Sequence, residues 1–293
     1  MTDLLELLLS ASASGCIYGL MALAYLLILR PTGIVNFAVG EWAMIGAFAT
    51  VILSMKLGLP SVLAIPGAAL VLAVLGWLTE WSVVRPLVVR GAGHLAPILV
   101  LLGMLVIYHQ AMLLYFGGDQ EPLDGPFGFR RVELGPLAGT PQSFFIIVAT
   151  VAVFGAVWLF FERTVWGKSF EAVAINRRAA ALMGINLRLV TALAFAGGAA
   201  VAGLAGLLDA PRGSVEVNMA LPLAIQGFSA LVIGGVHRVE GAILGGIILA
   251  FAEDLTRRYA PIPSGLALGV TPTLLIVFLL VRPTGLLRAK AAG

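Results

Sequence analysis

The chain has 293 residues, of which 60% are hydrophobic and 11% are charged, and its formal net charge is +3. Soluble domains carry about 25% charged residues, so a soluble globular protein is excluded and lipid is the expected solvent. The small net charge argues against a nucleic-acid-binding protein, and a single cysteine, Cys16, excludes an intrachain disulfide framework and a multi-cysteine metal site.

Apolar blocks alternate along the chain with short polar breaks. This pattern predicts an all-α polytopic membrane protein of about eight or nine transmembrane or re-entrant helices, forming a single transmembrane domain over residues 1–293. The last blocks before the C-terminal span, 221–236 and 241–254, are short, and they are either two tilted spans or a re-entrant pair. The expected spans are 4–29, 34–55, 61–84, 95–116, 143–161, 189–208, 221–236, 241–254 and 267–281.

The charges in the polar breaks predict which side of the membrane each break faces. Asp3 and Glu6 precede the first span, Arg30 follows it, and no signal peptide is expected, so the N-terminus is predicted outside. The Gly- and Pro-rich loop 117–142 falls on the same outer side. There it is either a connector or a landing surface for an extracytoplasmic partner. The basic breaks and the C-terminus are predicted to be cytoplasmic.

Polar residues at membrane depth are candidates for a transport path. Asn36, Gly40 and Glu41 belong to the second span, and Gln226 and Ser229 belong to block 221–236. Interrupted apolar segments with polar side chains are typical of such sites. The alternative is an internal hydrogen bond between helices. His109, late in the fourth span, is expected near its outer end.

Small residues recur at four-residue spacing in three stripes. Such stripes let helices approach closely in lipid. We expect ordinary helix packing for most of them, and contact with a sister subunit for some. The stripes are Ala11, Gly15 and Gly19; Gly198, Ala202 and Gly206; and Gly241 and Gly245.

The longest polar break between apolar blocks is the basic segment 163–188. Within it, Asn176 precedes a good helix-forming run and Gly184 follows that run, which predicts a short helix of about two turns. We expect arginine on its exposed side, with Leu182 and Met183 buried. Such a helix fits a groove on another protein, and the alternative is adhesion to anionic lipid.

The sequence offers no catalytic constellation, metal-binding motif or nucleotide site. Gly167-Lys168-Ser169 matches the end of a phosphate-binding loop, but Glu162 stands where that loop requires glycine. A different class of protein, a secondary transporter driven by an ion gradient, remains open, with Glu41 as its candidate acidic relay.

Three runs of residues resemble one known family. The run IVNFAVGE at 34–41 with MIGA at 44–47, the run NRRAAALMGIN at 176–186, and LVIGG at 231–235 with EGAILGG at 240–246 are similar to motifs of branched-chain amino acid ABC importer permeases. Their order along the chain is that of the family. The short N-terminus and the early Asn-Phe motif resemble the LivH-type subunit more than the longer LivM-type sister.

The resemblance implies a bacterial inner-membrane permease with several partners. These are a LivM-type sister permease or a second copy of the chain, two ATPase subunits that bind ATP and Mg²⁺, and a periplasmic substrate-binding protein. The small-molecule substrate would be a branched-chain or related amino acid, with urea, amides or aromatic acids as alternatives. No cofactor in this chain and no nucleic acid are implied.

The resemblance also assigns the coupling of ATPase motion to the segment 163–188. The sequence departs from the family at two positions: Arg177 stands where the general ABC loop has glycine, and Val39 stands where many members carry histidine. The implied coupling residues are Glu171, Asn176, Arg177, Arg178, Ala179, Met183, Gly184 and Ile185.

Overall fold

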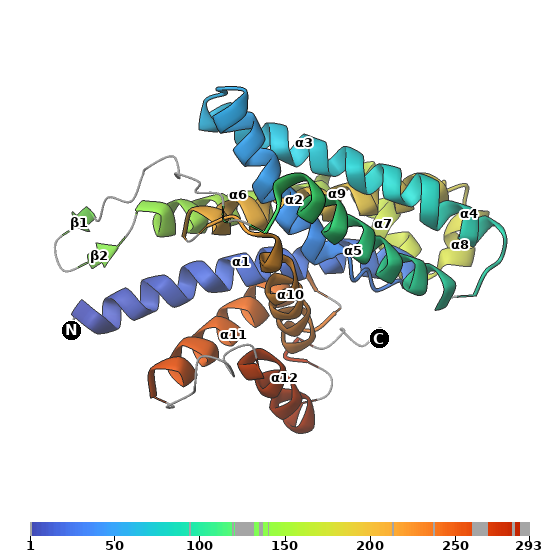
Figure 1. Cartoon of the computed structure of the whole chain (residues 1–293). Coiled ribbons are helices and arrows are strands. Elements are labelled where there is room, and N and C mark those ends of the chain that lie inside the picture. Colours follow the sequence, from blue (N-terminus) through green and yellow to red (C-terminus); the bar gives the residue numbers. More distant parts are fainter. Residues whose placement is uncertain are drawn as a thin grey trace.

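The computed structural model describes residues 2–93, 95–118, 120, 132–134, 137–139, 141–212, 214–236, 238–259, 269–282 and 285–287. Within these residues the chain is a bundle of apolar helices, which confirms the predicted all-helical polytopic membrane fold (Figure 1). Six helical stretches are long and apolar enough to cross a membrane. Two shorter apolar helices cover residues 39–54 and 270–281. The main helices are α1 (Thr2–Thr32), α2 (Val39–Val51), α3 (Ser61–Thr79), α4 (Arg85–Val89), α5 (Leu95–Phe116), α6 (Pro141–Arg163), α7 (Val165–Ile175), α8 (Arg177–Leu182), α9 (Leu187–Asp209), α10 (Ala220–Gly234), α11 (Val239–Tyr259) and α12 (Val270–Val281).

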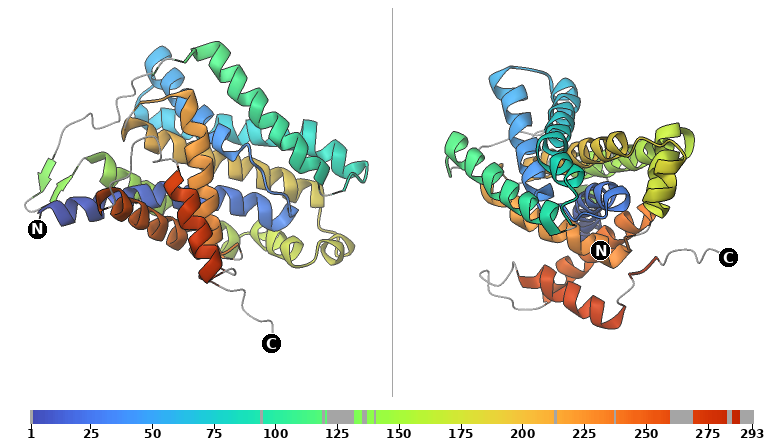
Figure 2. Two further views of the ribbon diagram at one scale, coloured as in Figure 1. Left: turned by 60° about the horizontal axis from the view of Figure 1, so that its bottom comes forward. Right: turned by 90° about the vertical axis from the view of Figure 1, so that its right-hand side faces the viewer.

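Helix α1 is the centre of the bundle. It packs against α6, α9, α10 and α11, and 83% of its most apolar window is buried inside the protein. The right-hand view of Figure 2 shows it surrounded by the other helices. A helix of 31 residues is about 46 Å long, more than the roughly 30 Å of hydrocarbon it must cross.

The second membrane segment begins later than the sequence predicted. Helix α1 ends at Thr32, and Gly33 follows with φ +70°, a left-handed conformation that suits glycine at a helix end. Residues 33–36 are not helical, and α2 starts only at Val39. The expected span 34–55 is therefore an irregular stretch followed by a short helix. Two π-helical turns, Ile52–Lys56 and Glu80–Val84, extend α2 and α3 respectively.

All three small-residue stripes pack inside this chain, so the expectation that some face a sister subunit is wrong within the part of the chain described. A Cβ on Gly15 or Gly19 would press on the α11 backbone at Ile247 and Ile243. The pairing of 15 with 247 and 19 with 243 shows that α1 and α11 run antiparallel. In lipid the hydrophobic effect does not drive helices together, so van der Waals contacts between closely approaching backbones hold them.

The short block 241–254 is also corrected by the structure. Helix α11 has 21 residues, which is long enough to cross a membrane, but it is not among the six stretches that are also apolar enough. The 15 residues of α10, with the preceding 3₁₀ turn Val217–Met219, make one of those six stretches, Val217–Gly234. Gly234 and Gly241 meet backbone to backbone where the two helices join, and Gly245 lies against Ala230. The two blocks are thus a closely packed helix pair.

The polar breaks gather at two opposite ends of the bundle, as the alternation of charge predicted. At one end, Gln120 Nε2 donates to Glu216 Oε2 at 3.1 Å, and Val132–Leu134 (β1) pairs antiparallel with Leu137–Gly139 (β2). The N-terminus and this hairpin lie at the left of Figure 1, and α4 and α8 lie at the right. Loop 117–142 therefore contains two short strands among its described residues; residues 119, 121–131, 135–136 and 140 lie outside the described part.

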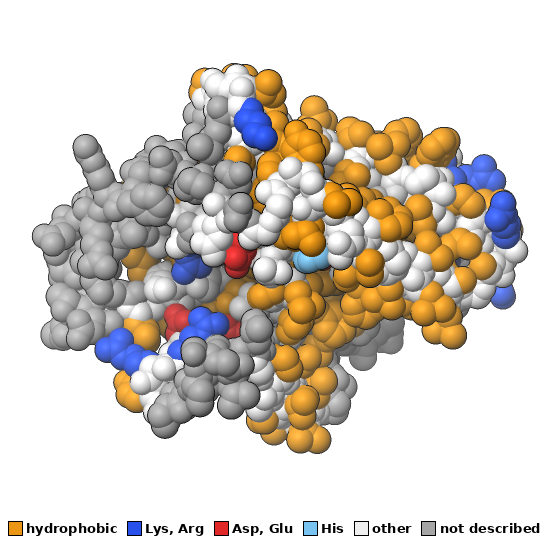
Figure 3. Space-filling view, viewed as in Figure 1, with side chains coloured by type: hydrophobic (Ala, Val, Ile, Leu, Met, Phe, Trp, Pro, Cys, Tyr) orange, Lys and Arg blue, Asp and Glu red, His pale blue; other side chains and the backbone are white. Residues whose placement is uncertain are grey.

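The long sides of the bundle are apolar. Only 6% of the α5 window and 17% of the α6 window are buried inside the protein. In Figure 3 hydrophobic side chains cover the middle of the molecule, while Lys and Arg gather toward its ends. This band is what lipid, or a second membrane subunit, would cover.

Candidate functional site

The first candidate site lies where α2 begins inside the bundle. Asn36 is 1% exposed, and its Oδ1 accepts the backbone N–H of Ala38 at 3.0 Å. This local turn starts the chain toward α2. The Asn36 Nδ2 is buried and has no partner among the described residues, so a donor remains available at membrane depth.

Glu41 lies one turn further along, at 4% exposure. Its Oε1 is 3.4 Å from His109 Nδ1 on α5, and its Oε2 is buried without a partner in the described chain. His109 therefore lies beside the first turn of α2, where it faces Glu41. The sequence did not reveal this pair because 68 residues separate its members.

The remaining candidate path residues lie where the start of α2 packs against α10. A Cβ on Gly40 would overlap the carbonyl of Ala220, so this glycine permits the crossing. The rings of Phe37 and Phe228 lie 6.5 Å apart. Gln226 is half-buried, whereas Ser229 is fully buried and its Oγ has no described partner. The structure thus places the segment 36–41 beside α10, while the side chain of Glu41 points to α5.

We predict that Glu41 and His109 stabilise the bundle as a unit. Removing His109 alone leaves a carboxylate at membrane depth, which costs more than removing both groups. Glu41→Leu with His109→Leu should therefore be less destabilising than the sum of the single changes, by between about 0.5 and 3 kcal/mol. Thermal unfolding in detergent micelles measures this difference.

Gln110 provides the matched control for this cycle. It is the next residue on α5 and is exposed. The pair Glu41→Leu with Gln110→Leu should be additive. If the effects of Glu41→Leu and His109→Leu also add, the 3.4 Å contact contributes nothing to stability.

The second candidate site is the basic segment 163–188. It forms two helices rather than the one expected. Thr164 caps α7 by accepting from Gly167 N, and Asn176 caps α8 by accepting from Arg178 N and Ala179 N at 3.1 and 3.0 Å. Gly184, at φ +84°, ends the second helix. The short helix predicted from Asn176 to Gly184 is therefore present.

One half of the predicted facing of α8 is wrong: Arg178 is exposed as expected, but Leu182 and Met183 are not buried. Leu182 is 89% exposed and Met183 is 83% exposed, while Ala180 is the buried residue. Ile175, at the end of α7, is 86% exposed. The small alanine lets α8 lie close to the bundle, and that closeness leaves the larger apolar side chains outside. The end of the molecule thus presents an apolar tip, made of Ile175, Leu182 and Met183.

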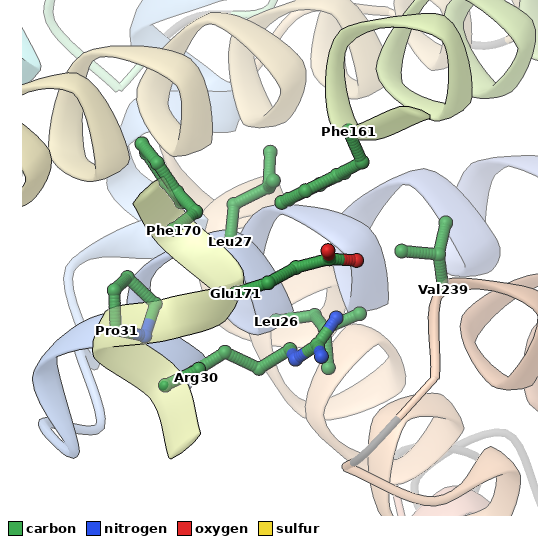
Figure 4. Close-up of a pocket in the computed structure, with 9 residues that line it drawn as sticks. Leu26, Leu27, Arg30, Pro31, Phe161, Phe170, Glu171 and Val239 are labelled. Carbon is green, nitrogen blue, oxygen red and sulfur yellow. The ribbon is translucent and has the colours of Figure 1, made fainter. Parts of the chain in front are cut away.

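The inward side of this segment is tied to the bundle. Arg177 Nη1 donates to the Pro31 carbonyl at 3.4 Å, at the end of α1. Glu171 pairs with Lys168 at 3.3 Å and lines a narrow pocket with Arg30. Figure 4 shows the Arg30 and Glu171 side chains extending toward the side of the pocket where Val239 of α11 lies. Motion of α7 and α8 would therefore reach α1.

Of the other predicted coupling residues, Arg178 and Ala179 are exposed and Ile185 is half-buried. Among the described residues, no group of three or more His, Cys, Asp or Glu side chains could hold a metal ion. What the two sites offer is a buried polar cluster inside the membrane and an apolar tip at one end.

The family described as branched-chain amino acid transport system, permease component, matches residues 7–280. The chain is 31% identical to the high-affinity branched-chain amino acid transport permease BraD of Pseudomonas aeruginosa, over 97% of this chain and 95% of that protein. It is 30% identical to LivH of Escherichia coli K12, over 93% and 92%. The membrane fold is similar to that of PsaBC from Streptococcus pneumoniae, with a TM-score of 0.53 at 14% identity, covering 95% of this chain and 91% of that chain.

Proposed function

The chain belongs to the family of permease components of branched-chain amino acid transport systems, and on that premise we propose that it forms the translocation path of a binding-protein-dependent ABC importer. The substrate class is branched-chain or related amino acids. As its relatives are transport permeases, the chain is a transport subunit and not an enzyme.

The observation that supports ATPase coupling best is the apolar tip of α7 and α8. Ile175, Leu182 and Met183 project from a basic, polar end of the bundle, where lipid hydrocarbon would not cover them. Exposed apolar side chains on a short helix fit a groove on a partner protein. Arg177 then carries the motion of that partner to the end of α1.

The remaining assignments complete the proposal. Two ATPase subunits bind ATP and Mg²⁺ and dock on α7 and α8, so this chain needs no cofactor. A sister permease, LivM-type, or a second copy lies beside it in the bacterial inner membrane. A periplasmic binding protein delivers substrate to the end that carries the N-terminus and the β hairpin. The end with α4 and α8 and the C-terminus face the cytoplasm, which agrees with the arginines gathered there.

Asn36, Gly40, Glu41, Gln226 and Ser229 are proposed to border the path. The unpartnered Asn36 Nδ2 and Glu41 Oε2 are a donor and an acceptor suited to the carboxylate and ammonium of an amino acid. The same architecture could import urea, amides or aromatic acids. A gradient-driven carrier is the alternative of a different class, since Glu41 is a buried carboxylate.

Reconstitution in liposomes tests the proposal. The chain is assembled with a candidate sister permease, ATPases and binding protein from the same organism, and uptake of radiolabelled leucine is measured. We expect uptake only with both ATP inside and binding protein outside. Uptake by the chain alone under an imposed proton or sodium gradient would instead establish the carrier. Competition by unlabelled amides and aromatic acids ranks the substrates.

A further inference from the structure

A cavity of about 250 Å³ opens at the end of the bundle where α4 and α8 lie. Its walls come from the π-helical turn before α4, from α4 itself, from α8 and from the first turn of α9. Charged and apolar groups share the lining: Glu80, Arg85, Arg177 and Arg188 stand beside the valines of α4, at 88 and 89. Of the residues that line it, Arg177 alone has a role proposed above, in coupling.

Three guanidinium groups and one carboxylate line the cavity, and the carboxylate already has hydrogen-bond partners within the protein. Glu80 is 2% exposed, and it accepts from Arg85 Nη2 at 2.7 Å and from Thr191 Oγ1 at 3.3 Å. Among the described residues, Arg188 makes no ion pair, and the Arg177 side chain donates only to the Pro31 carbonyl. Since a guanidinium has five donors, the lining keeps an unbalanced positive charge and free donors.

The cavity lies at the level where a membrane protein meets lipid headgroups. Trp81 and Trp77, one and two turns before Arg85, are 53% and 44% exposed, and their rings stack 6.4 Å apart. Outward tryptophans mark the membrane–water interface. Val88 and Val89, which follow Arg85 in α4, are 42% and 61% exposed. Apolar surface therefore flanks the arginines of the cavity, and Figure 3 shows Lys and Arg side chains beside hydrophobic ones at the right-hand end.

We infer that this cavity binds a phosphate group, and that the phosphate is the headgroup of an anionic phospholipid. Arginine is the side chain best suited to bind phosphate bidentately, and basic pockets between membrane helices hold such headgroups. The exposed valines and tryptophans fit the adjoining glycerol and acyl chains. An amino acid would need an acceptor for its ammonium group, and Glu80 is occupied by Arg85 and Thr191.

A lipid in this place would connect parts of the protein that otherwise touch little. It would join α4 to Arg177 of α8 and to the start of α9 at Arg188. The lipid would thus hold the segment 163–188 in place against α4. Its binding can be measured on the full chain alone, so the result does not depend on the transport proposal.

The test is lipid retention by the purified chain in native mass spectrometry, with phosphatidylglycerol compared against phosphatidylcholine. We expect preferential binding of phosphatidylglycerol, and Arg188→Gln should weaken it about fivefold. Arg90→Gln is the matched control. Arg90 is an exposed arginine at the same end, directly after α4, and it does not line the cavity. It should leave the affinity unchanged.

Two results would overturn the inference. Equal loss with Arg188→Gln and Arg90→Gln would mean diffuse attraction to the basic end, and equal binding of the two lipids would mean that no anion is recognised. Inorganic phosphate is added as a competitor in a separate arm. If it displaces the lipid in a manner that needs Arg188, the phosphate site stands but the assignment to a lipid headgroup fails. If it does not, the lipid is the ligand.

Discussion

Replacement of Gly184 by proline should reduce ATP-driven uptake to the level measured without ATP, while the chain still inserts in the membrane. Gly184 has φ +84°, and its N–H donates to the Ala181 carbonyl at 3.1 Å. Proline fixes φ near about −65° and has no N–H, so the end of α8 must rearrange. Strain of this kind costs about 1–3 kcal/mol, enough to displace Leu182 and Met183 from a partner groove.

Gly184→Asn is the matched control for the proline variant, because asparagine tolerates left-handed φ and keeps the N–H. It should retain most of the uptake. Arg177→Glu, which loses the contact with the Pro31 carbonyl, should also uncouple transport without blocking insertion. Uptake and ATP hydrolysis are measured together in proteoliposomes. Full ATP-dependent uptake by Gly184→Pro or by Arg177→Glu would show that α8 is not the coupling helix.

Gly206→Leu should prevent the bundle from assembling. A Cβ at this position would overlap the carbonyl of Ala43 and lie 2.9 Å from its Cα, so α9 and α2 could not keep their present separation. Overpacking that only a backbone shift can relieve costs about 3 kcal/mol. We expect almost no monodisperse protein after detergent extraction, as measured by fluorescence-detected size-exclusion chromatography.

The control for this change is Gly155→Leu on α6, where nothing lies within 4 Å of an added Cβ. It makes the same chemical change on a surface that faces outward, and the yield should not fall. Gly206→Ala should give an intermediate loss, since its single carbon already meets the Ala43 backbone. A normal yield of Gly206→Leu would mean that α2 and α9 are not packed as described.

The sequence by itself determined the features that depend on neighbouring residues and on the solvent. Its composition required lipid, and the alternation of charged breaks predicted which loops share an end of the bundle. The capping pattern of Asn176 and Gly184 located α8, because a helix cap is a contact within one turn. The start of α2 was misplaced because the apolar run across residues 33–38 does not reveal that the backbone there is not helical.

Only the tertiary structure decided which face of each helix is inside. Hydropathy could not show that Leu182 and Met183 are exposed while Ala180 is buried, or that the glycine stripes pack within one chain. Nor could it pair Glu41 with His109, or bring Arg85 beside Arg188. In water, an apolar side chain marks the inner face of a helix. In a membrane, apolar side chains meet lipid and protein alike, so the arrangement depends on how closely backbones can approach and on where the few polar groups find partners.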